Sequence, residues 1–140
     1  AGPVQLHTRL ARDTRVLGHF DDTRVLLHRN AAVPWFILVP ATDATEFLAL
    51  PETLRNRVLG EAARTGAFVQ QYFGSPKINF AAIGNLVPQL HLHVVGRDPE
   101  DCCWPNPVWG HLHEHAEYTP AEVAAIVAAM TTHCTLQPAT

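Results

Sequence analysis

The most regular pattern in the chain is the strict alternation of polar and apolar residues from Gln89 to Val94. Successive side chains of a strand point to opposite faces, so the pattern predicts a strand with one polar and one aliphatic face. The polar face carries Gln89, His91 and His93, and the aliphatic face carries Leu90, Leu92 and Val94. We expect the polar face to line a cleft, with its two imidazoles roughly 7 Å apart by backbone rise.

Shorter apolar runs predict the remaining strands. Thr23–His28 and Trp35–Pro40 flank a break that contains Pro34, and we expect them to form a hairpin. A second hairpin is predicted between a strand over Lys77–Ile83 and the alternating strand, joined by a tight Gly84–Asn85 loop. The first 20 residues are mixed in character, and we expect a short helix or irregular turn over Thr8–Thr14.

Two stretches carry helical signals. Apolar residues three to four positions apart predict one long amphipathic helix from Pro51 to Phe73, and Gly74 suits its C-terminal cap. Thr119–Glu122 reads as the start of a second helix that ends near Met130. The expected fold class is therefore α+β, a mostly antiparallel sheet of about five strands with one long helix packed on it and a C-terminal helix. Residues 1–140 are expected to form a single domain.

Composition narrows the range of partners. The chain has 10 Lys and Arg residues against 13 Asp and Glu, a net charge of −3, so we expect no nucleic-acid polymer as a partner. Three cysteines do not make a disulfide framework, which favours a cytoplasmic location. No apolar run approaches the roughly 20 residues of a membrane span, so no membrane association is expected.

Three interpretations compete for His91 and His93. Both imidazoles could face solvent without a function, or they could be a metal-ligand pair, because His-x-His on a strand often binds zinc or iron. The third interpretation is nucleophilic catalysis, since an imidazole attacks phosphorus readily and leaves again. The pair alone does not decide between them, and the flanking residues have to.

The segment Gly84–Arg97 reads Gly-Asn-Leu-Val-Pro-Gln-Leu-His-Leu-His-Val-Val-Gly-Arg. It resembles the signature of the histidine-triad (HIT) superfamily, His-φ-His-φ-His-φ-φ with φ apolar, preceded by a Gly-Gln-Ser/Thr-Val-type loop. The match holds at His91, His93 and the apolar positions, whereas Gln89 replaces the first histidine and Asn85 the usual glutamine. The resemblance extends over roughly Arg24 to Arg97, including a hairpin whose second strand ends in Val-Pro.

This resemblance implies hydrolysis or transfer at the α-phosphate of a nucleotide conjugate, such as a dinucleoside polyphosphate, a phosphoramidate or an adenylate. His91 would be the nucleophile, and His93 would contact the phosphate or protonate the leaving group with its near-neutral pKa. Asn85, the loop amides and Asn79 would stabilise charge on the phosphate. Gln89 and His28 complete the expected substrate-binding residues, with Gln89 as a hydrogen-bonding residue that does not titrate near neutral pH. The resemblance further implies no cofactor, no metal and a homodimer.

Other departures from the family pattern concern nucleoside binding. Phe36 is predicted to stand where the family has the histidine of a Pro-x-His turn, and His28 where it has a ribose-binding Asp or Asn. Trp35 and Phe36 read as core or lid aromatics. In the loop Asp98–Gly110, Trp104 and Trp109 need burial near the active face or against a partner subunit.

Two other function classes stay open. One is a nucleotide-binding module with little turnover, which the missing histidines favour. The other is a metal-binding protein that uses His91 and His93 with ligands from the tail. The candidate tail ligands are Cys102, Cys103, His111, His113 and His115, although a solvated segment is the favoured interpretation of these histidines.

Overall fold

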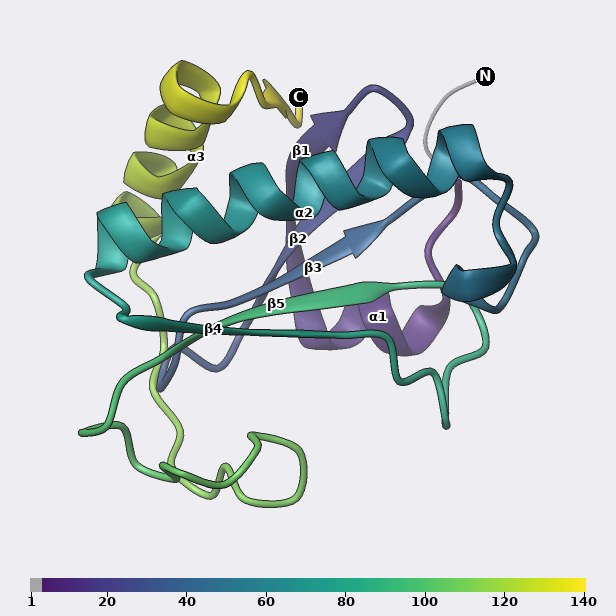
Figure 1. The fold of residues 1–140 in the computed structure, drawn as a ribbon. Helices are drawn as coiled ribbons and strands as arrows, with labels where there is room; N and C mark the ends of the chain where they lie inside the picture. The colour runs from purple at the N-terminus through teal and green to yellow at the C-terminus, as the bar shows by residue number, and fades with distance from the viewer. Residues whose placement is uncertain (1–3) are drawn as a thin grey trace.

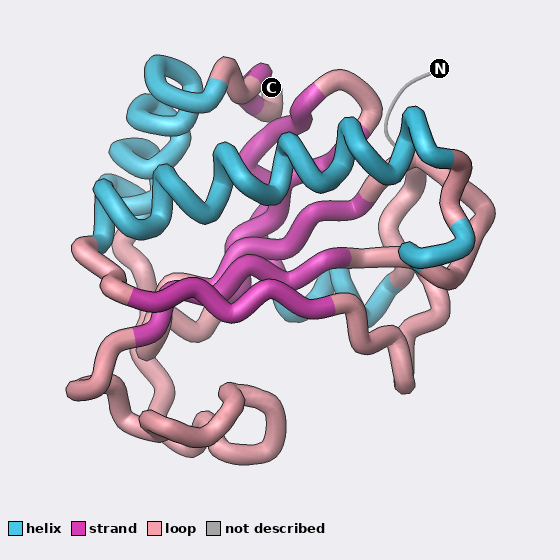
Figure 2. Tube along the Cα trace, in the orientation of Figure 1, coloured by secondary structure: helices cyan, strands magenta, loops and turns pink. Residues whose placement is uncertain are grey.

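A computed structural model describes residues 4–140. Its strands are β1 (Thr14–Phe20), β2 (Thr23–His28), β3 (Trp35–Val39), β4 (Lys77–Ala81), β5 (Leu92–Arg97) and β6 (Gln137–Pro138). They form one sheet in the order β4-β5-β3-β2-β1-β6, in which each neighbouring pair is antiparallel (Figures 1 and 2). The predicted α+β class is confirmed, with six strands in place of about five.

Helices cover the sheet on both sides. The helices are α1 (Thr8–Asp13), the 3₁₀ turn η1 (Phe47–Ala49), α2 (Glu52–Phe73) and α3 (Pro120–Cys134). The long helix α2 crosses one face of the sheet, and α3 packs beside one end of α2 (Figure 1). Helix α1 lies behind the sheet in the same view. In the part of the chain that is described, no helix combines the length and apolar character needed to cross a bilayer.

The alternation of side chains along β3 and β5 produces two separate cores. Phe36, Leu92 and Val94 belong to the cluster beneath α2, whereas Trp35 and Val95 belong to a second cluster on the opposite face, which also contains Leu10 of α1. Because both faces of these two strands are covered, every residue of β3 and β5 is buried. The predicted alternation is therefore correct, and the polar face of β5 is enclosed rather than open.

Most predicted elements lie where the sequence indicated. The strand Thr23–His28 has its predicted bounds and pairs with β3 as the expected hairpin. Helix α2 ends at Phe73 and is capped, as predicted, by Gly74, whose backbone is left-handed with φ of 69°. Thr119 and Glu122 form a reciprocal capping box at the start of α3, which continues to Cys134 rather than ending near Met130.

Strand β1 was not predicted, because its residues interleave arginine, histidine and glycine with apolar residues. It pairs with β2 and carries an irregularity between Val16 and Gly18. Gly18 is required by packing, because a Cβ there would lie 2.1 Å from the carbonyl oxygen of Gln137. The glycine that weakens the strand signal thus admits the C-terminal strand β6 against the sheet.

The connection between β4 and β5 is much longer than predicted. Strand β4 ends at Ala81 and β5 begins at Leu92, so the hairpin is correct but the tight Gly84–Asn85 loop is wrong. Gly84 does make a left-handed turn, with φ of 64°. The longer connection allows the segment around Asn85 and Leu86 to project over the sheet face opposite α2.

The loop after β5 is anchored by Arg97, whose side chain is 2% exposed. Its guanidinium donates to both carboxylate oxygens of Asp101, at 2.8 and 3.1 Å, and to Oδ1 of Asn79 at 3.0 Å. The paired guanidinium lowers the pKa of Asp101 to about 2 against the opposing effect of burial, with backbone N–H donors helping. A buried cation with its donors satisfied fixes this loop onto the sheet.

Candidate functional site

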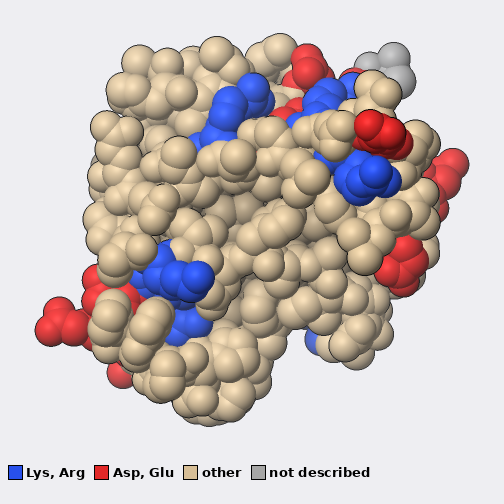
Figure 3. Space-filling model, in the orientation of Figure 1, with Lys and Arg blue, Asp and Glu red and all other residues tan. Residues whose placement is uncertain are grey.

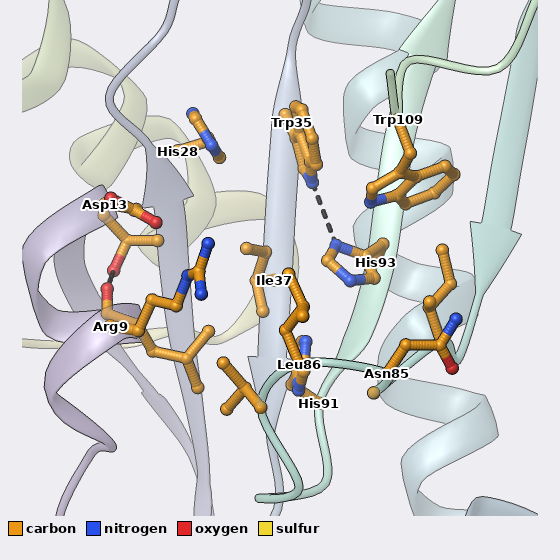
Figure 4. A pocket seen from close by; sticks show the side chains of 15 residues that line it. Arg9, Asp13, His28, Trp35, Ile37, Asn85, Leu86, His91, His93 and Trp109 are labelled. Carbon is orange, nitrogen blue, oxygen red and sulfur yellow. Dashed lines mark hydrogen bonds between the residues drawn. The ribbon is translucent and has the colours of Figure 1, made fainter.

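A cavity of about 480 Å³ lies on the sheet face opposite α2 (Figure 4). Its walls come from α1, β2, β3, the β4–β5 connection, the segment leading into β5, and the loop after it. The lining residues are Arg9, Leu10, Asp13, Thr14, His28, Trp35, Ile37, Ile83, Gly84, Asn85, Leu86, Val87, His91, His93 and Trp109. Aliphatic and indole side chains form most of this wall, and His91 and His93 lie together on one side of it (Figure 4).

His91 is buried, with 7% of its surface exposed. Its Nδ1 lies 2.7 Å from the backbone carbonyl oxygen of Gln89. A carbonyl oxygen only accepts, so Nδ1 must carry a proton and donate it in this bond. The Nε2 lone pair of the neutral ring is then left free, which is the protonation state that a nucleophilic imidazole requires.

His93 is held in the opposite tautomer. The indole Nε1–H of Trp35 donates to Nδ1 of His93 at 3.0 Å, so in the neutral ring the proton is on Nε2. Burial lowers the pKa of His93 to about 3, with further lowering by His91 and His28. The folded ring thus departs from the near-neutral reference pKa that would permit an acid role, and at pH 7 His93 is an uncharged N–H donor.

Three aromatic rings pack against His93, those of Trp35, His91 and Trp109, and a fourth, His28, lies behind Trp35. Trp35 stacks on His28 with ring centroids 4.3 Å apart and an interplanar angle of 18°. Trp109 meets Trp35 edge-on at 5.7 Å and His93 at 5.0 Å, and His91 meets His93 at 4.9 Å. Trp109 therefore lies near the active face, one of the two positions predicted for the tryptophans of its loop.

Trp35 was interpreted from the sequence only as a core or lid aromatic, and its role at His93 was missed. Phe36, which was expected to replace a site histidine, instead lies in the opposite core against Phe68 and Phe73. The pairing of β3 with β5 explains why Trp35, and not Phe36, reaches the site. Ile37 pairs with His93, and residues two apart share a face, so Trp35 must lie on the histidine face and Phe36 beneath α2.

The remaining predicted site residues divide between the cavity and other places. His28 and Asn85 line the cavity, and burial lowers the pKa of His28 against the opposing charge of Asp13. Asn79 lies on the same face of the sheet as His93, but its Oδ1 accepts from Arg97 near the end of β5, so it supports the loop and does not line the cavity. Arg9 and Asp13, which line the cavity from α1, were missed because nothing in the sequence indicates that this helix packs there.

Gln89 was predicted to bind substrate, but its side chain faces the N-terminal segment and does not line the cavity. Its Oε1 accepts from the backbone N–H of His7 at 2.7 Å, and its Nε2 donates to the carbonyl oxygen of Gln5 at 2.9 Å. The carboxamide therefore pairs with the chain as a neighbouring strand would. It fastens the segment that leads into α1, and α1 forms one wall of the cavity.

The proposed set of metal ligands is not brought together. Within residues 4–140, no three His, Cys, Asp or Glu side chains come close enough to hold an ion. His111 and His113 are exposed, and His115 lies 3.5 Å from Glu117 at the surface. The tail histidines thus form the solvated segment that the sequence favoured.

The burial of His93 predicts a pH-dependent loss of stability. The unfolded ring titrates near 6.5 and the folded ring near 3, so the unfolded state binds the extra proton first as the pH falls. Stability contributed by neutral His93 is complete above pH 6.5 and declines below it, by about 2 kcal/mol between pH 7 and pH 5. Urea unfolding at both pH values should show this loss in the wild type and a smaller loss in His93→Asn. The exposed His113→Asn should behave as the wild type does, and equal losses in all three proteins would contradict the assignment.

The family to which the chain belongs is shown by its similarity to known proteins. The model of the HIT domain matches residues 9–100.

Three histidine-triad proteins of known structure align closely with the chain. The protein from Marinobacter aquaeolei is 39% identical with a TM-score of 0.86, over 97% of this chain and 100% of its own. The protein from Bradyrhizobium japonicum is 35% identical with a TM-score of 0.85, over 92% of this chain and 96% of its own. The protein from Sinorhizobium meliloti is 32% identical with a TM-score of 0.85, over 92% and 96%. A comparison with curated proteins finds no match. The chain belongs to the histidine-triad (HIT) domain family, whose members generally act on nucleotides.

Proposed function

We propose that this protein hydrolyses, or transfers the nucleotidyl group of, a nucleotide conjugate at its α-phosphate. The observation that carries the proposal is the hydrogen bond from His91 Nδ1–H to the carbonyl oxygen of Gln89. It holds the ring in the tautomer whose Nε2 is free to attack. The same ring lies in a cavity of about 480 Å³, a volume suited to a small molecule.

The reaction proceeds through a covalent intermediate on His91. Its Nε2 attacks phosphorus in line with the leaving group, which departs, and water then hydrolyses the nucleotidyl-imidazole. His93 presents its Nε2–H to a phosphoryl oxygen, and the amide of Asn85 with the backbone N–H groups of its loop adds further donors. Donors held in fixed positions stabilise the charge that develops on the equatorial oxygens.

The walls of the cavity suit the nucleoside. Leu10, Ile37, Leu86 and Val87 present aliphatic surface beside the indoles of Trp35 and Trp109. Burying a planar base against such surface is favourable, at about 25 cal/mol for each Å² removed from water. Arg9, Asp13 and His28 line another part of the same cavity, where they offer polar contacts to the sugar. This chemistry needs no metal or other cofactor, because the phosphate contacts come from N–H groups.

The protein is further proposed to be a homodimer. Strand β4 is an edge of the sheet, and Leu59, Tyr72 and Phe80, near it on α2 and β4, are 40%, 43% and 44% exposed. A shallow apolar hollow of about 370 Å³ lies between α2 and β4. In Figure 3 much of the surface in this view is free of charged side chains. An unpaired edge beside an apolar surface is what a second copy of the chain would cover.

A cytoplasmic location is proposed on the state of the cysteines. Cys102, Cys103 and Cys134 are all free thiols, and Cys103 and Cys134 are buried, where burial raises the pKa of each thiol. Protonated, buried thiols without a disulfide suit a reducing compartment.

Replacing the nucleophile should abolish turnover without unfolding the protein. His91→Asn removes the atom that bonds phosphorus, so kcat should fall by about 10³-fold or more while the unfolding midpoint changes little. The measurement is a screen of adenylyl and guanylyl conjugates, with His113→Asn as the matched control. Turnover by the wild type should survive EDTA. Near-wild-type turnover by His91→Asn would refute the mechanism, whereas nucleotide binding by the wild type without any turnover would favour the binding module.

Substitutions at Gln89 should act through the N-terminal segment. Gln89→His retains a side chain that can donate and accept hydrogen bonds, and we expect a change in rate below about tenfold, less than about 1.4 kcal/mol of barrier. Gln89→Leu leaves the backbone groups of Gln5 and His7 without partners and should be worse. Rates on the best substrate, together with hydrogen exchange at residues 5–13, would test both. A gain of a hundredfold from Gln89→His would mean that the natural site is catalytically disabled.

A charge on the proposed dimer surface should separate the subunits. Phe80→Lys places an ammonium group in the apolar surface, so the sedimentation mass should fall from about twice the 15.4 kDa chain mass to the chain mass itself. Val16→Lys is the control, because Val16 is 41% exposed on a strand at the other end of the sheet. A wild-type protein that sediments at one chain mass at micromolar concentrations would rule out the dimer.

A further inference from the structure

The indole of Trp35 is held by burial, by two ring contacts and by one hydrogen bond. Only 8% of the residue is exposed. One face of the ring stacks on His28, and Trp109 meets it edge-on. Its single hydrogen-bond donor, Nε1–H, is directed at Nδ1 of His93 at 3.0 Å (Figure 4). The geometry thus assigns this buried donor to one histidine of the site.

We propose that Trp35 is a positioning residue that fixes the tautomer of His93, and that it thereby restricts the site to leaving groups that depart as anions. The favoured substrates are nucleoside phosphoric or carboxylic anhydrides, whose leaving group is a phosphate or a carboxylate. Phosphoramidates, whose leaving group is an amine, are disfavoured. This inference rests on the proposed function and narrows its substrate class.

The first step of the argument concerns the proton on His93. An indole N–H is a donor only and cannot accept a proton. A second proton on His93 would have to sit at Nδ1, where two N–H groups would then point at each other across 3.0 Å. His93 therefore keeps one proton, on Nε2. Release of that proton would leave an imidazolate, so His93 can donate a hydrogen bond to a phosphoryl oxygen but cannot give its proton to a leaving group.

The second step concerns the other charged and titratable groups that face His93. His91 is the nucleophile, and its Nδ1–H is held by Gln89. Nδ1 of His28 accepts from the backbone N–H of Asn30 at 3.1 Å, and burial lowers the pKa of His28. Across the cavity, the hydrogen bond from Arg12 lowers the pKa of Asp13, which is therefore ionised. None of these groups supplies a transferable proton near neutral pH.

The reaction balances for an anhydride without any proton donor. The bond from His91 Nε2 to phosphorus forms as the bond from phosphorus to the leaving oxygen breaks, and that oxygen keeps both electrons as a stable anion. Water then attacks phosphorus, the N–P bond breaks, its electron pair returns to Nε2, and the proton of the water passes to solvent. An amine would instead have to leave as a strongly basic amide anion, which a site without an acid does not support.

Nuclear magnetic resonance tests the tautomer without any need for activity. In wild-type protein we expect the Nε2 of His93 to be protonated and Nδ1 to be bare from pH 5 to pH 9, with a coupling across the hydrogen bond from Trp35 Nε1. Trp35→Phe keeps an aromatic ring but removes the donor, so the Nδ1 signal should shift and the pKa of His93 should rise. Trp109→Phe, which also replaces an indole against His93, should leave the tautomer unchanged. A proton on Nδ1 in the wild type, or an absent coupling, overturns the proposal even if Trp35→Phe fails to fold.

A matched pair of substrates tests the choice of leaving group. A dinucleoside polyphosphate and an alkyl phosphoramidate of the same nucleoside should differ in kcat/KM by about 100-fold in favour of the anhydride, the usual scale of an acid contribution. At pH 6 this ratio should shrink by about tenfold in Trp35→Phe and persist in Trp109→Phe. Equal turnover of both substrates by the wild type would overturn the substrate class. If neither substrate is turned over, the proposed function fails, and the resonance experiment still decides the role of Trp35.

Discussion

The period-two alternation of β5 between two buried layers is the constraint on which the site depends. Leu92 and Val94 pack beneath α2, and His93 and Val95 lie on the opposite face. Pairing on both edges, to β3 and β4, fixes the register of this strand. A slip by one residue would place His93 beneath α2 and aliphatic side chains in the cavity. Burial of the leucines thus holds the imidazoles in place, and the same packing that stabilises the fold orients the chemistry.

Enclosure of the polar face then determines what each histidine can do. Two imidazoles separated by one residue have opposite tautomers, because His91 meets a carbonyl oxygen and His93 meets an indole N–H. The first partner is local and belongs to the backbone. The second lies 58 residues away on β3 and is in place only because β3 pairs with β5 in a fixed register. His91 is suited to act as a nucleophile and His93 as a neutral donor because their hydrogen-bond partners differ, although both residues are histidines.

Much of the fold and part of the site follow from the sequence. Periodicity identifies β2, β3, α2 and the histidine face, and the capping box identifies the start of α3, because these signals are local. The role of Trp35, the displacement of Asn79 and the contribution of Arg9 and Asp13 depend on contacts between distant segments. Asn79, for example, has a residue type suited to a phosphate site, but its side-chain oxygen Oδ1 accepts a hydrogen bond from Arg97, 18 positions away. Strand β1 also depends on a distant contact. Its Gly18 weakens the local strand signal, and a glycine is needed there because the backbone of Gln137 packs against it.

Gln89 shows why a broken motif need not mean a broken site. The first position of the triad lies three residues before β5, which begins at Leu92, and its side chain leaves the cavity while His91 and His93 stay in it. The carboxamide donates and accepts at once, and the backbone of residues 5–7 needs one partner of each kind. A neutral imidazole also has one donor and one acceptor, but a carboxamide presents both on one planar edge. This edge matches an extended peptide, as a neighbouring strand does. Gln89 therefore does not contact the cavity, and its hydrogen bonds instead hold the segment that leads into α1, which forms one wall of the cavity.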